Sequence, residues 1–310
     1  MGKMATREAY GKALAELVAQ NESVVVLDAD LSKSTKTADA KKVCPERHKN
    51  MGIAEGNMMA VAAGLAAQGE TVFASTFAIF AAGRAFEQIR NSLCYPKLNV
   101  KVCATHAGIT VGEDGASHQS VEDLALMRAI PNMTVISPCD AASTKKAVFA
   151  AAALHGPVYM RLGRLGVEDV YTEEECNFEI GKGIVIHEGK DVVIIATGYM
   201  VQQAKAACEM LREKGIEPTL IDMHTIKPID KDLILKYAES ASLVVTCEEH
   251  NVLGGLGSAV SEVLSQAMPR KMVMVGLQDT FGESGTPAEL VEKYGLTAKH
   301  VCEAVVKGLE

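Results

Sequence analysis

Short apolar runs alternate with helical stretches along this chain of 310 residues, and that alternation limits its possible folds more than any other feature. In the first half, runs typical of strands cover residues 23–28, 70–73, 99–105, 133–137 and 157–162. Helical spacing is expected over residues 4–20, 57–68, 78–93, 121–129 and 141–154. Strands and helices in this order predict a mainly parallel sheet with helices on both faces.

An acidic, turn-rich stretch at residues 166–180 interrupts the alternation, which then resumes. Further strands are expected at residues 191–196, 218–222, 243–247 and 272–277. Further helices are expected at residues 201–214, 231–240, 256–266, 287–294 and 298–308. The sequence therefore predicts an α/β protein with two α/β domains, residues 1–165 and 181–310, joined by a linker at 166–180.

Composition argues against several classes of protein. The net charge of −8 is opposite to that of a nucleic-acid-binding surface, so no nucleic-acid partner is expected. No apolar run is long enough to span a bilayer, so no membrane association is expected. The eight cysteines are scattered without a CxxC pair, which indicates reduced thiols in a cytoplasmic protein and no metal site in this chain.

The segment Thr105–Ser120 places two histidines and two adjacent carboxylates on a loop that three glycines keep irregular. Glycines let the backbone approach a ligand closely, which favours a site for a small polar ligand over isolated surface histidines. The polar members are His106, Glu113, Asp114 and His118. Metal binding is the alternative use of such a cluster, but the spacing between the histidines fits no common zinc pattern.

Glu55 lies between apolar and glycine residues where a helix is expected to begin. It is either an acid that the helix dipole favours or a carboxylate placed for proton exchange. Phe77 and Phe80 are three residues apart, so they are either core residues or an apolar wall for a flat heterocycle. Arg161 and Arg164, at a strand end, suit either phosphate recognition or salt bridges near the linker.

Neither half carries a GxGxxG or GxxxxGK[ST] nucleotide-binding signature. The segment Gly254-Gly255-Leu-Gly257 follows an expected strand and is weakly similar to a phosphate loop. A tight turn between a strand and a helix is the simpler interpretation of these glycines.

The order of these segments resembles that of the transketolase family of thiamine diphosphate enzymes. The segments are Ala5–Arg7, Asp28–Ser34, Gly52–Met58, Ser75–Phe80, Thr105–Ser120, Leu162–Arg164, Glu248–Asn251, Gly254–Gly257 and Phe281–Gly285. The resemblance covers nearly the whole chain and implies a pyrimidine-binding domain followed by a transketolase C-terminal domain. The family's metal motif, Gly-Asp-Gly with a downstream Asn, has no counterpart here. The chain therefore resembles the C-terminal subunit of a split transketolase.

The resemblance implies a role for each matching residue. Glu55 would hydrogen-bond the aminopyrimidine ring of thiamine diphosphate, Phe77 and Phe80 would pack on that ring, and Asp30 and His118 would lie against the cofactor. The implied catalytic residues are Glu55, His106, Asp114 and His118.

The same resemblance implies a substrate site beside the cofactor. His106, Asp114 and His118 would bind sugar hydroxyls, while Arg7, Ser34 and Arg164 would hold a phosphate. Arg161 would replace Arg164 if the register of the strand differs. Gly56 and Gly83 depart from the family pattern, because many members have His and a third aromatic residue there.

The implied activity is transfer of a two-carbon ketol unit between a ketose phosphate and an aldose phosphate, as in the pentose phosphate pathway. An N-terminal partner subunit would supply the diphosphate site with Mg²⁺ or Ca²⁺, in an α2β2 heterotetramer. The alternatives are a deoxyxylulose phosphate synthase-like enzyme, a 2-oxo acid dehydrogenase β subunit, or a non-catalytic regulatory homologue.

Overall fold

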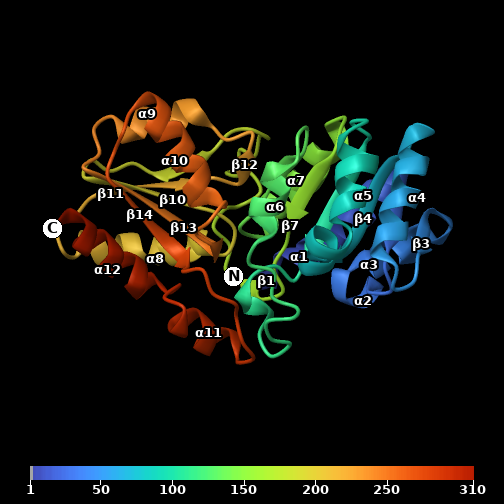
Figure 1. Ribbon diagram of the computed structural model, residues 1–310, viewed down its shortest axis with the longest axis horizontal. Helices are drawn as coiled ribbons and strands as arrows, with labels where there is room; N and C mark the ends of the chain where they lie inside the picture. The colour runs from blue at the N-terminus through green and yellow to red at the C-terminus, as the bar shows by residue number, and fades with distance from the viewer. Residues whose placement is uncertain (1–2) are drawn as a thin grey trace.

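The computed structural model describes residues 3–310. These residues form two sheets that lie side by side, each covered by helices (Figure 1). The first sheet has seven strands in the order β12-β6-β7-β5-β4-β2-β3. The second has five, in the order β14-β13-β10-β11-β9. This arrangement confirms the α/β class and the mainly parallel sheets.

The first sheet is parallel except at one edge. Its parallel strands are β2 (Val24–Asp28), β3 (His48–Asn50), β4 (Thr71–Phe77), β5 (Val100–Thr105), β6 (Thr134–Ile136) and β7 (Val158–Arg161). Strand β4 is buried along its whole length, as expected of a central strand covered on both faces. It therefore carries Phe77, its last residue, to the carboxyl edge of the sheet.

Helices cover both faces of this sheet. They are α1 (Thr6–Gln20), α2 (Ser32–Thr35), α3 (Thr37–Val43), α4 (Glu55–Ala67), α5 (Phe86–Gln88), α6 (Asp123–Ala129) and α7 (Ala141–Ala153). Tyr10 of α1 and Val148 of α7 pack in one core with Phe73. Met58 of α4 packs on the opposite face with Val72. Neighbouring residues of β4 thus point into different cores, as the strand period requires.

The second sheet consists of β9 (Ile184–His187), β10 (Val192–Ala196), β11 (Pro218–Asp222), β13 (Leu243–Asn251) and β14 (Met272–Leu277). Only β9 runs antiparallel, at an edge. The helices of this half are α8 (Met200–Arg212), α9 (Lys231–Ala238), α10 (Leu256–Ala267), α11 (Pro287–Lys293) and α12 (Ala298–Leu309). The amphipathic helices α8 and α12 pack together on one face, with Leu211 and Val305 in a shared core.

Two short strands pair outside the regular order of the sheets. Strand β12 (Thr225–Lys227) comes from the second half but pairs antiparallel with β6. Strand β1 (Met4–Ala5) pairs with β8 (Gly166–Val167), inside the expected linker. Tyr171 and Cys176 of that segment are buried. Residues 166–180 are therefore packed against the protein, and the division at 1–165, 166–180 and 181–310 remains our proposal.

Most expected elements are present with ends that differ by a few residues, but the helix expected at 78–93 is wrong in type. It is divided into π-helical turns at Phe80–Arg84 and Ile89–Cys94 around the short α5. Such turns often occur at functional sites. The sequence analysis also missed α2, α3, β1, β3, β8, β9, β12 and the short 3-10 turns Pro45–Arg47 and Ile109–Val111.

All eight cysteines are free thiols, and seven of them are buried, as the sequence predicts. Between residues 3 and 310 we find no helix with both the length and the apolar character of a membrane span.

Asp222, at the end of β11, is a fully buried carboxyl that joins three segments. Its Oδ2 accepts hydrogen bonds from the Tyr171 hydroxyl at 3.0 Å and from the Cys139 thiol at 3.4 Å. Burial raises the pKa of Asp222 to about 7. Because the pKa is higher in the folded than in the unfolded state, the native protein loses stability as the pH rises from 4 towards 7.

We expect Asp222→Asn to remove this pH dependence, because the amide stays neutral. Relative to wild type, the variant should gain about 2–4 kcal/mol in unfolding free energy between pH 4.5 and pH 8. Urea unfolding at both pH values measures the gain, with Asp279→Asn at an exposed position as the control. Parallel pH profiles for wild type and Asp222→Asn would contradict the prediction.

Candidate active site

Glu55 is the first residue of α4, and its side chain is only 1% exposed. Both carboxylate oxygens accept hydrogen bonds from Nη1 of Arg84, each at 2.9 Å. Arg84 is half exposed, and its guanidinium carbon lies 4.6 Å above the ring of Phe80. A buried carboxylate is therefore linked to an aromatic surface through one arginine.

Four rings gather beside this pair. Phe77 and Phe80 stack with their centroids 5.7 Å apart, and His106 stacks on Phe77 at 3.8 Å. The ring of His118 meets Phe80 edge-on at 5.5 Å and Phe77 at 6.2 Å. The two phenylalanines belong to the end of β4 and the start of the following π-helical turn, so they do not share a regular helical face. Together the rings form an apolar wall with imidazole nitrogens at its margin.

His106 is held in a defined protonation state. Its Nε2 lies 3.2 Å from Nη1 of Arg7, and its Nδ1 lies 2.9 Å from the hydroxyl of Thr105. Because arginine can only donate, Nε2 accepts and Nδ1 carries the hydrogen. Burial, followed by the charges of Arg7 and Arg164, lowers the pKa of His106 to about 3, so the ring is neutral at ordinary pH. Its φ of +57° is rare for a residue with a side chain and marks backbone strain.

Arg7 and Arg164 line one cavity of about 220 Å³, together with Thr110 and Glu113. Arg7 donates to the carbonyl oxygen of Ser34 at 2.9 Å, and its buried Nε has no hydrogen-bond partner within residues 3–310. Arg164 lies 3.2 Å from the Glu113 carboxylate and donates to the carbonyl of Val111. Two guanidinium groups thus converge on a space open to an anion.

Asp30 and Asp114 have no hydrogen bond to the ring cluster in residues 3–310. Asp30 has a left-handed φ of +64°, and its carboxylate accepts from the side-chain amide of Asn50 at 2.8 Å. Asp114 is exposed on the same loop as His106 and His118.

Arg161 is committed to the interior of the protein. Its guanidinium donates to the Asp123 carboxylate at 2.9 Å and to the main-chain oxygens of Ser120 and Glu249 at 3.3 and 2.9 Å. Its side chain is 6% exposed, and that of Asp123 is fully buried. Burial acts to raise the pKa of Asp123, but the charge of Arg161, the charge of His250 and the hydrogen bonds from Arg161 and Tyr159 together outweigh it and leave the pKa below its ordinary value. The pair is therefore ionised and structural.

The glycines of the loop have a role that the sequence did not reveal. Gly108, Gly112 and Gly115 all have positive φ, between 75° and 86°. A Cβ on Gly108 would stand 2.2 Å from the carboxyl group of Glu249, and one on Gly115 would stand 2.6 Å from the hydroxyl of Ser284. These glycines therefore admit side chains of the second half of the chain.

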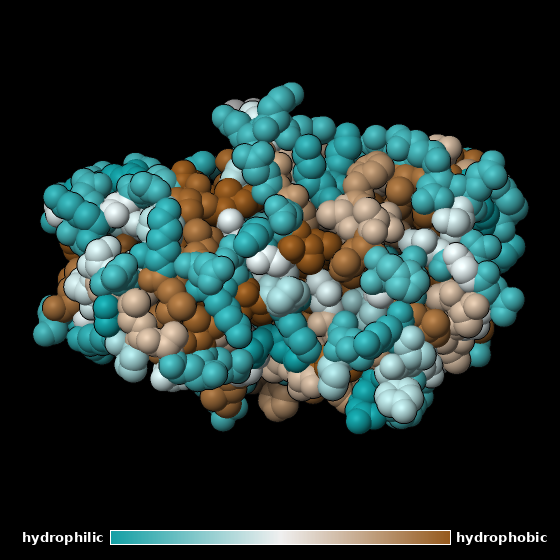
Figure 2. Space-filling model, turned by 90° about the horizontal axis from the view of Figure 1, so that it is seen from above, coloured by the Kyte–Doolittle hydropathy of each residue, from teal (hydrophilic) through white to brown (hydrophobic). Residues whose placement is uncertain are grey.

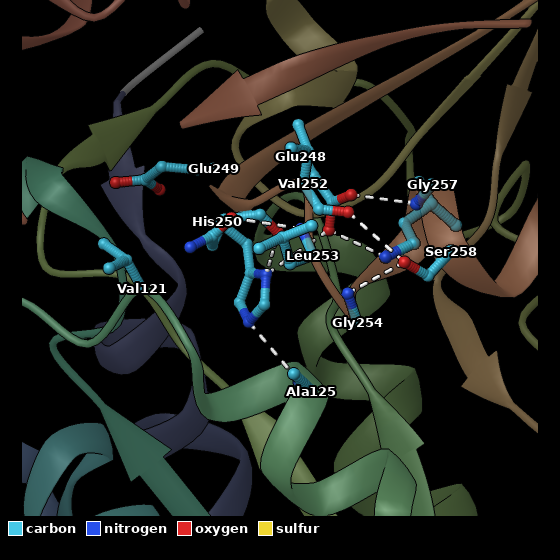
Figure 3. Close-up of polar contacts among 12 residues, drawn as sticks. Val121, Ala125, Glu248, Glu249, His250, Val252, Leu253, Gly254, Gly257 and Ser258 are labelled. Carbon is cyan, nitrogen blue, oxygen red and sulfur yellow. Dashed lines mark hydrogen bonds and ion pairs between the residues drawn. The ribbon is translucent and has the colours of Figure 1, made fainter. Parts of the chain in front are cut away.

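The segment Gly254–Gly257 is the tight turn that the sequence favoured. Gly254 has a φ of +82°, and helix α10 begins at Leu256. The main-chain N–H groups of Leu256 and Gly257 donate to the Glu248 carboxylate at 2.7 and 2.8 Å (Figure 3). A carboxylate of the chain itself thus fills the anion position of this helix end.

Sequence reasoning missed Arg84, and it recognised Glu249 only as part of the segment Glu248–Asn251, without a role. Arg84 is four residues after Phe80, a spacing that brings side chains together on a helix and could have drawn attention to it. Glu249 could have been found only from the alternation along its strand, since it follows Glu248 on the opposite side.

Two family models match the chain. The transketolase pyrimidine-binding domain matches residues 2–168, and the transketolase C-terminal domain matches residues 181–301. An inferred transketolase C-terminal section of Methanocaldococcus jannaschii is 51% identical over 306 residues, which are 98% of this chain and 96% of that protein. The 6-deoxy-6-sulfo-D-fructose transketolase subunit SqwH of a Clostridium species is 41% identical over 96% of this chain and 92% of its own length.

Among solved structures, a split-gene transketolase described as an inactive β4 tetramer superposes with a TM-score of 0.93. It is 59% identical and covers 99% of this chain and 98% of its own.

We expect Arg161→Met to lower the unfolding free energy by about 3–5 kcal/mol, because it leaves the buried Asp123 carboxylate without its partner. Arg164→Met, on a partly exposed residue, should change it by less than about 1 kcal/mol. Chemical denaturation of both variants provides the measurement. Equal losses for the two would show that the interior pair has no special role.

Proposed function

Because this chain belongs to the transketolase family, we propose that it is the C-terminal subunit of a split transketolase that transfers a two-carbon ketol unit from a ketose phosphate to an aldose phosphate. One observation carries the proposal. The hydrogen bond between His106 and Arg7 joins the ring cluster to the cavity that Arg7 and Arg164 line. A surface for a flat heterocycle and a pocket for an anion are thus two parts of one site.

The ring cluster fits the pyrimidine half of thiamine diphosphate. Phe77 and Phe80 offer stacked apolar faces, and Asp30 would lie near the cofactor. Glu55 offers a carboxylate that would hydrogen-bond the ring nitrogen once Arg84 shares or releases it. When bound, the cofactor supplies the electron sink for the two-carbon fragment. The chain's own residues orient the ring and exchange its proton.

The histidines serve the sugar. His106 is neutral, so a sugar hydroxyl that replaced the Thr105 hydroxyl would accept the hydrogen on Nδ1 without meeting a charged ring. His118 faces the same aromatic wall and would contact both the cofactor's amino group and the sugar. Asp114 would reach the sugar from the exposed part of the loop. We assign catalytic roles to Glu55, His106, Asp114 and His118.

Arg7 and Arg164 would bind the substrate phosphate, with Ser34 beside Arg7. The unpartnered Nε of Arg7 supports this role, because a buried donor without an acceptor is costly and a phosphate oxygen would satisfy it. The Glu113 carboxylate on Arg164 would give way to the phosphate. We prefer Arg164 to Arg161 for this role, because Nε and Nη2 of Arg161 donate to groups inside the protein.

We propose that an N-terminal partner supplies the diphosphate site with Mg²⁺ or Ca²⁺, in an α2β2 assembly. The description of the similar solved structure as an inactive β4 tetramer supports dependence on a partner. Ile53, two residues before Glu55, and Tyr95 are 78% and 85% exposed, which suits a surface that another chain covers. Hydrophobic patches lie between hydrophilic residues on the face in Figure 2. The free thiols suit the reducing cytoplasm.

We expect the purified chain alone to have no ketol-transfer activity, because it holds half of the proposed site. Addition of the N-terminal subunit, thiamine diphosphate and Mg²⁺ should restore turnover with xylulose 5-phosphate as donor and ribose 5-phosphate as acceptor. A coupled assay of the released triose phosphate measures it. Turnover by the chain alone would refute the dependence.

In the assembled enzyme, Glu55→Gln should lower kcat about 10²- to 10⁴-fold, because the amide cannot exchange a proton. Gln has the same size and still accepts from Arg84, so the unfolding free energy should change by less than about 1 kcal/mol. Glu87→Gln, in the neighbouring α5, is the matched control. A kcat within threefold of wild type for Glu55→Gln would rule out the assigned role.

A further inference from the structure

The motif Glu248–Asn251 was recognised in the sequence, but nothing so far assigns it a function. It is the carboxyl end of β13, where successive side chains point to opposite sides. In Figure 3 the carboxylate of Glu248 points to the start of α10, whereas that of Glu249 points away from it. Glu249 therefore faces a different part of the molecule.

Glu249 reaches the substrate loop of the first half. Its Oε1 accepts a hydrogen bond from the main-chain N–H of Thr110 at 2.7 Å, across 139 residues of sequence. The side chain is 3% exposed. Thr110 lies in the 3-10 turn Ile109–Val111, between His106 and Asp114. One carboxylate of the second half thus holds the middle of the loop that carries the proposed sugar-binding residues.

The loop is shaped to receive this carboxylate. The absence of a side chain on Gly108 leaves the space that the Glu249 carboxyl group occupies. A second contact holds the far end of the loop, since the side-chain amide of Gln119 donates to the carbonyl oxygen of Glu283 at 2.9 Å. The loop therefore cannot change its conformation without losing contacts to the second half.

The residues after Glu249 fix the distance between the halves. His250 Nε2 accepts from the N–H of Ala125 at 3.4 Å (Figure 3). The N–H of Asn251 donates to the carbonyl of Val121 at 2.7 Å. Arg161 holds the main-chain oxygen of Glu249 itself at 2.9 Å. The backbone at Glu249, His250 and Asn251 is thus held in place by hydrogen bonds to the first half of the chain, and this fixes where the Glu249 side chain meets the loop.

This contact is costly for stability alone. Burial raises the pKa of Glu249, although the charge of Arg161 acts in the opposite direction, so ionising the group in this place is unfavourable. A buried carboxyl whose ionisation is unfavourable and that contacts the proposed site is better explained by a demand of the site than by folding.

We propose that Glu249 is a positioning residue through which the second domain sets the conformation of the substrate loop, and with it the placement of His106, Asp114 and His118. Glu249 does not touch the substrate. It acts through its contacts with Thr110 and Gly108, and the length of its side chain determines whether these contacts form. The second domain is thereby a working part of the sugar site, which deepens the proposed function and, for its kinetic consequences, rests on it.

Two substitutions of Glu249 distinguish the effect of side-chain length from the effect of the acidic group. Glu249→Gln keeps the length and an acceptor oxygen, whereas Glu249→Asp keeps the charge but withdraws it by one methylene group. Hydrogen–deuterium exchange of peptides covering residues 107–119 in the purified chain should be at least about tenfold faster in Glu249→Asp, since the loss of one hydrogen bond to a charged group gives that factor. Glu249→Gln should exchange like wild type. Glu283→Gln is the control, because only the main-chain oxygen of Glu283 contacts the loop.

In the assembled enzyme, Glu249→Asp should raise KM for xylulose 5-phosphate about tenfold and should change the Kd of thiamine diphosphate by a clearly smaller factor, because only His118 of the three placed residues would contact the cofactor. Glu249→Gln should restore KM. Unchanged exchange in Glu249→Asp, or an equal loss of sugar and cofactor affinity, would overturn the proposal. If the wild-type assembly transfers no ketol unit, the proposed function fails, whereas the exchange experiment still decides whether Glu249 holds the loop.

Discussion

The buried guanidinium of Arg161 is the interaction on which the arrangement of this protein depends. It lies at the end of β7 and bonds Asp123 at the start of α6, the end of the substrate loop at Ser120, and the main chain of Glu249 in the second domain. A neutral side chain could not satisfy these acceptors together. The first sheet, the substrate loop and the second domain therefore meet at Arg161. The loop that ends there also carries His106 and His118, two members of the ring cluster.

The buried ionisable side chains differ in whether a partner of opposite charge supports their ionised form. Arg161 and Asp123 neutralise each other, so their ionisation is mutually supported. Asp222 and Glu249 have no partner of that quality, and burial makes their charged forms unfavourable. Pairs of the first kind stabilise a defined geometry, and groups of the second kind are retained despite a cost. Both kinds lie where the two halves of the chain meet, so polar contacts specify the junction in addition to apolar packing.

The sequence was sufficient for the fold because its apolar runs have the lengths and spacing of strands and helices. It also indicated Glu55, Phe77, Phe80, His106 and His118, whose positions at element ends bring them to one edge of the sheet. It could not reveal the pairing of Arg84 with Glu55, which depends on a π-helical turn that no apolar period distinguishes from an α-helix. Nor could it distinguish Arg161 from Arg164, because only tertiary contacts show which guanidinium is enclosed.

The same limit applies to the glycines of the loop. Their number correctly indicated a need for close approach, but the approaching group is Glu249 or Ser284 from more than a hundred residues away. Such long-range complementarity has no local signature. For Arg7, the sequence indicated the residue itself, but only the structure shows that its Nε has no hydrogen-bond partner.

Strand β12 has a consequence for how the chain can be divided. By pairing with β6 it covers an edge that would otherwise present free N–H and C=O groups to other molecules. A fragment that ended after β7 would expose this edge and part of a core that mixes side chains of both sheets. The halves should therefore unfold in a single cooperative transition, and a gene fusion or circular permutation would have to preserve both together.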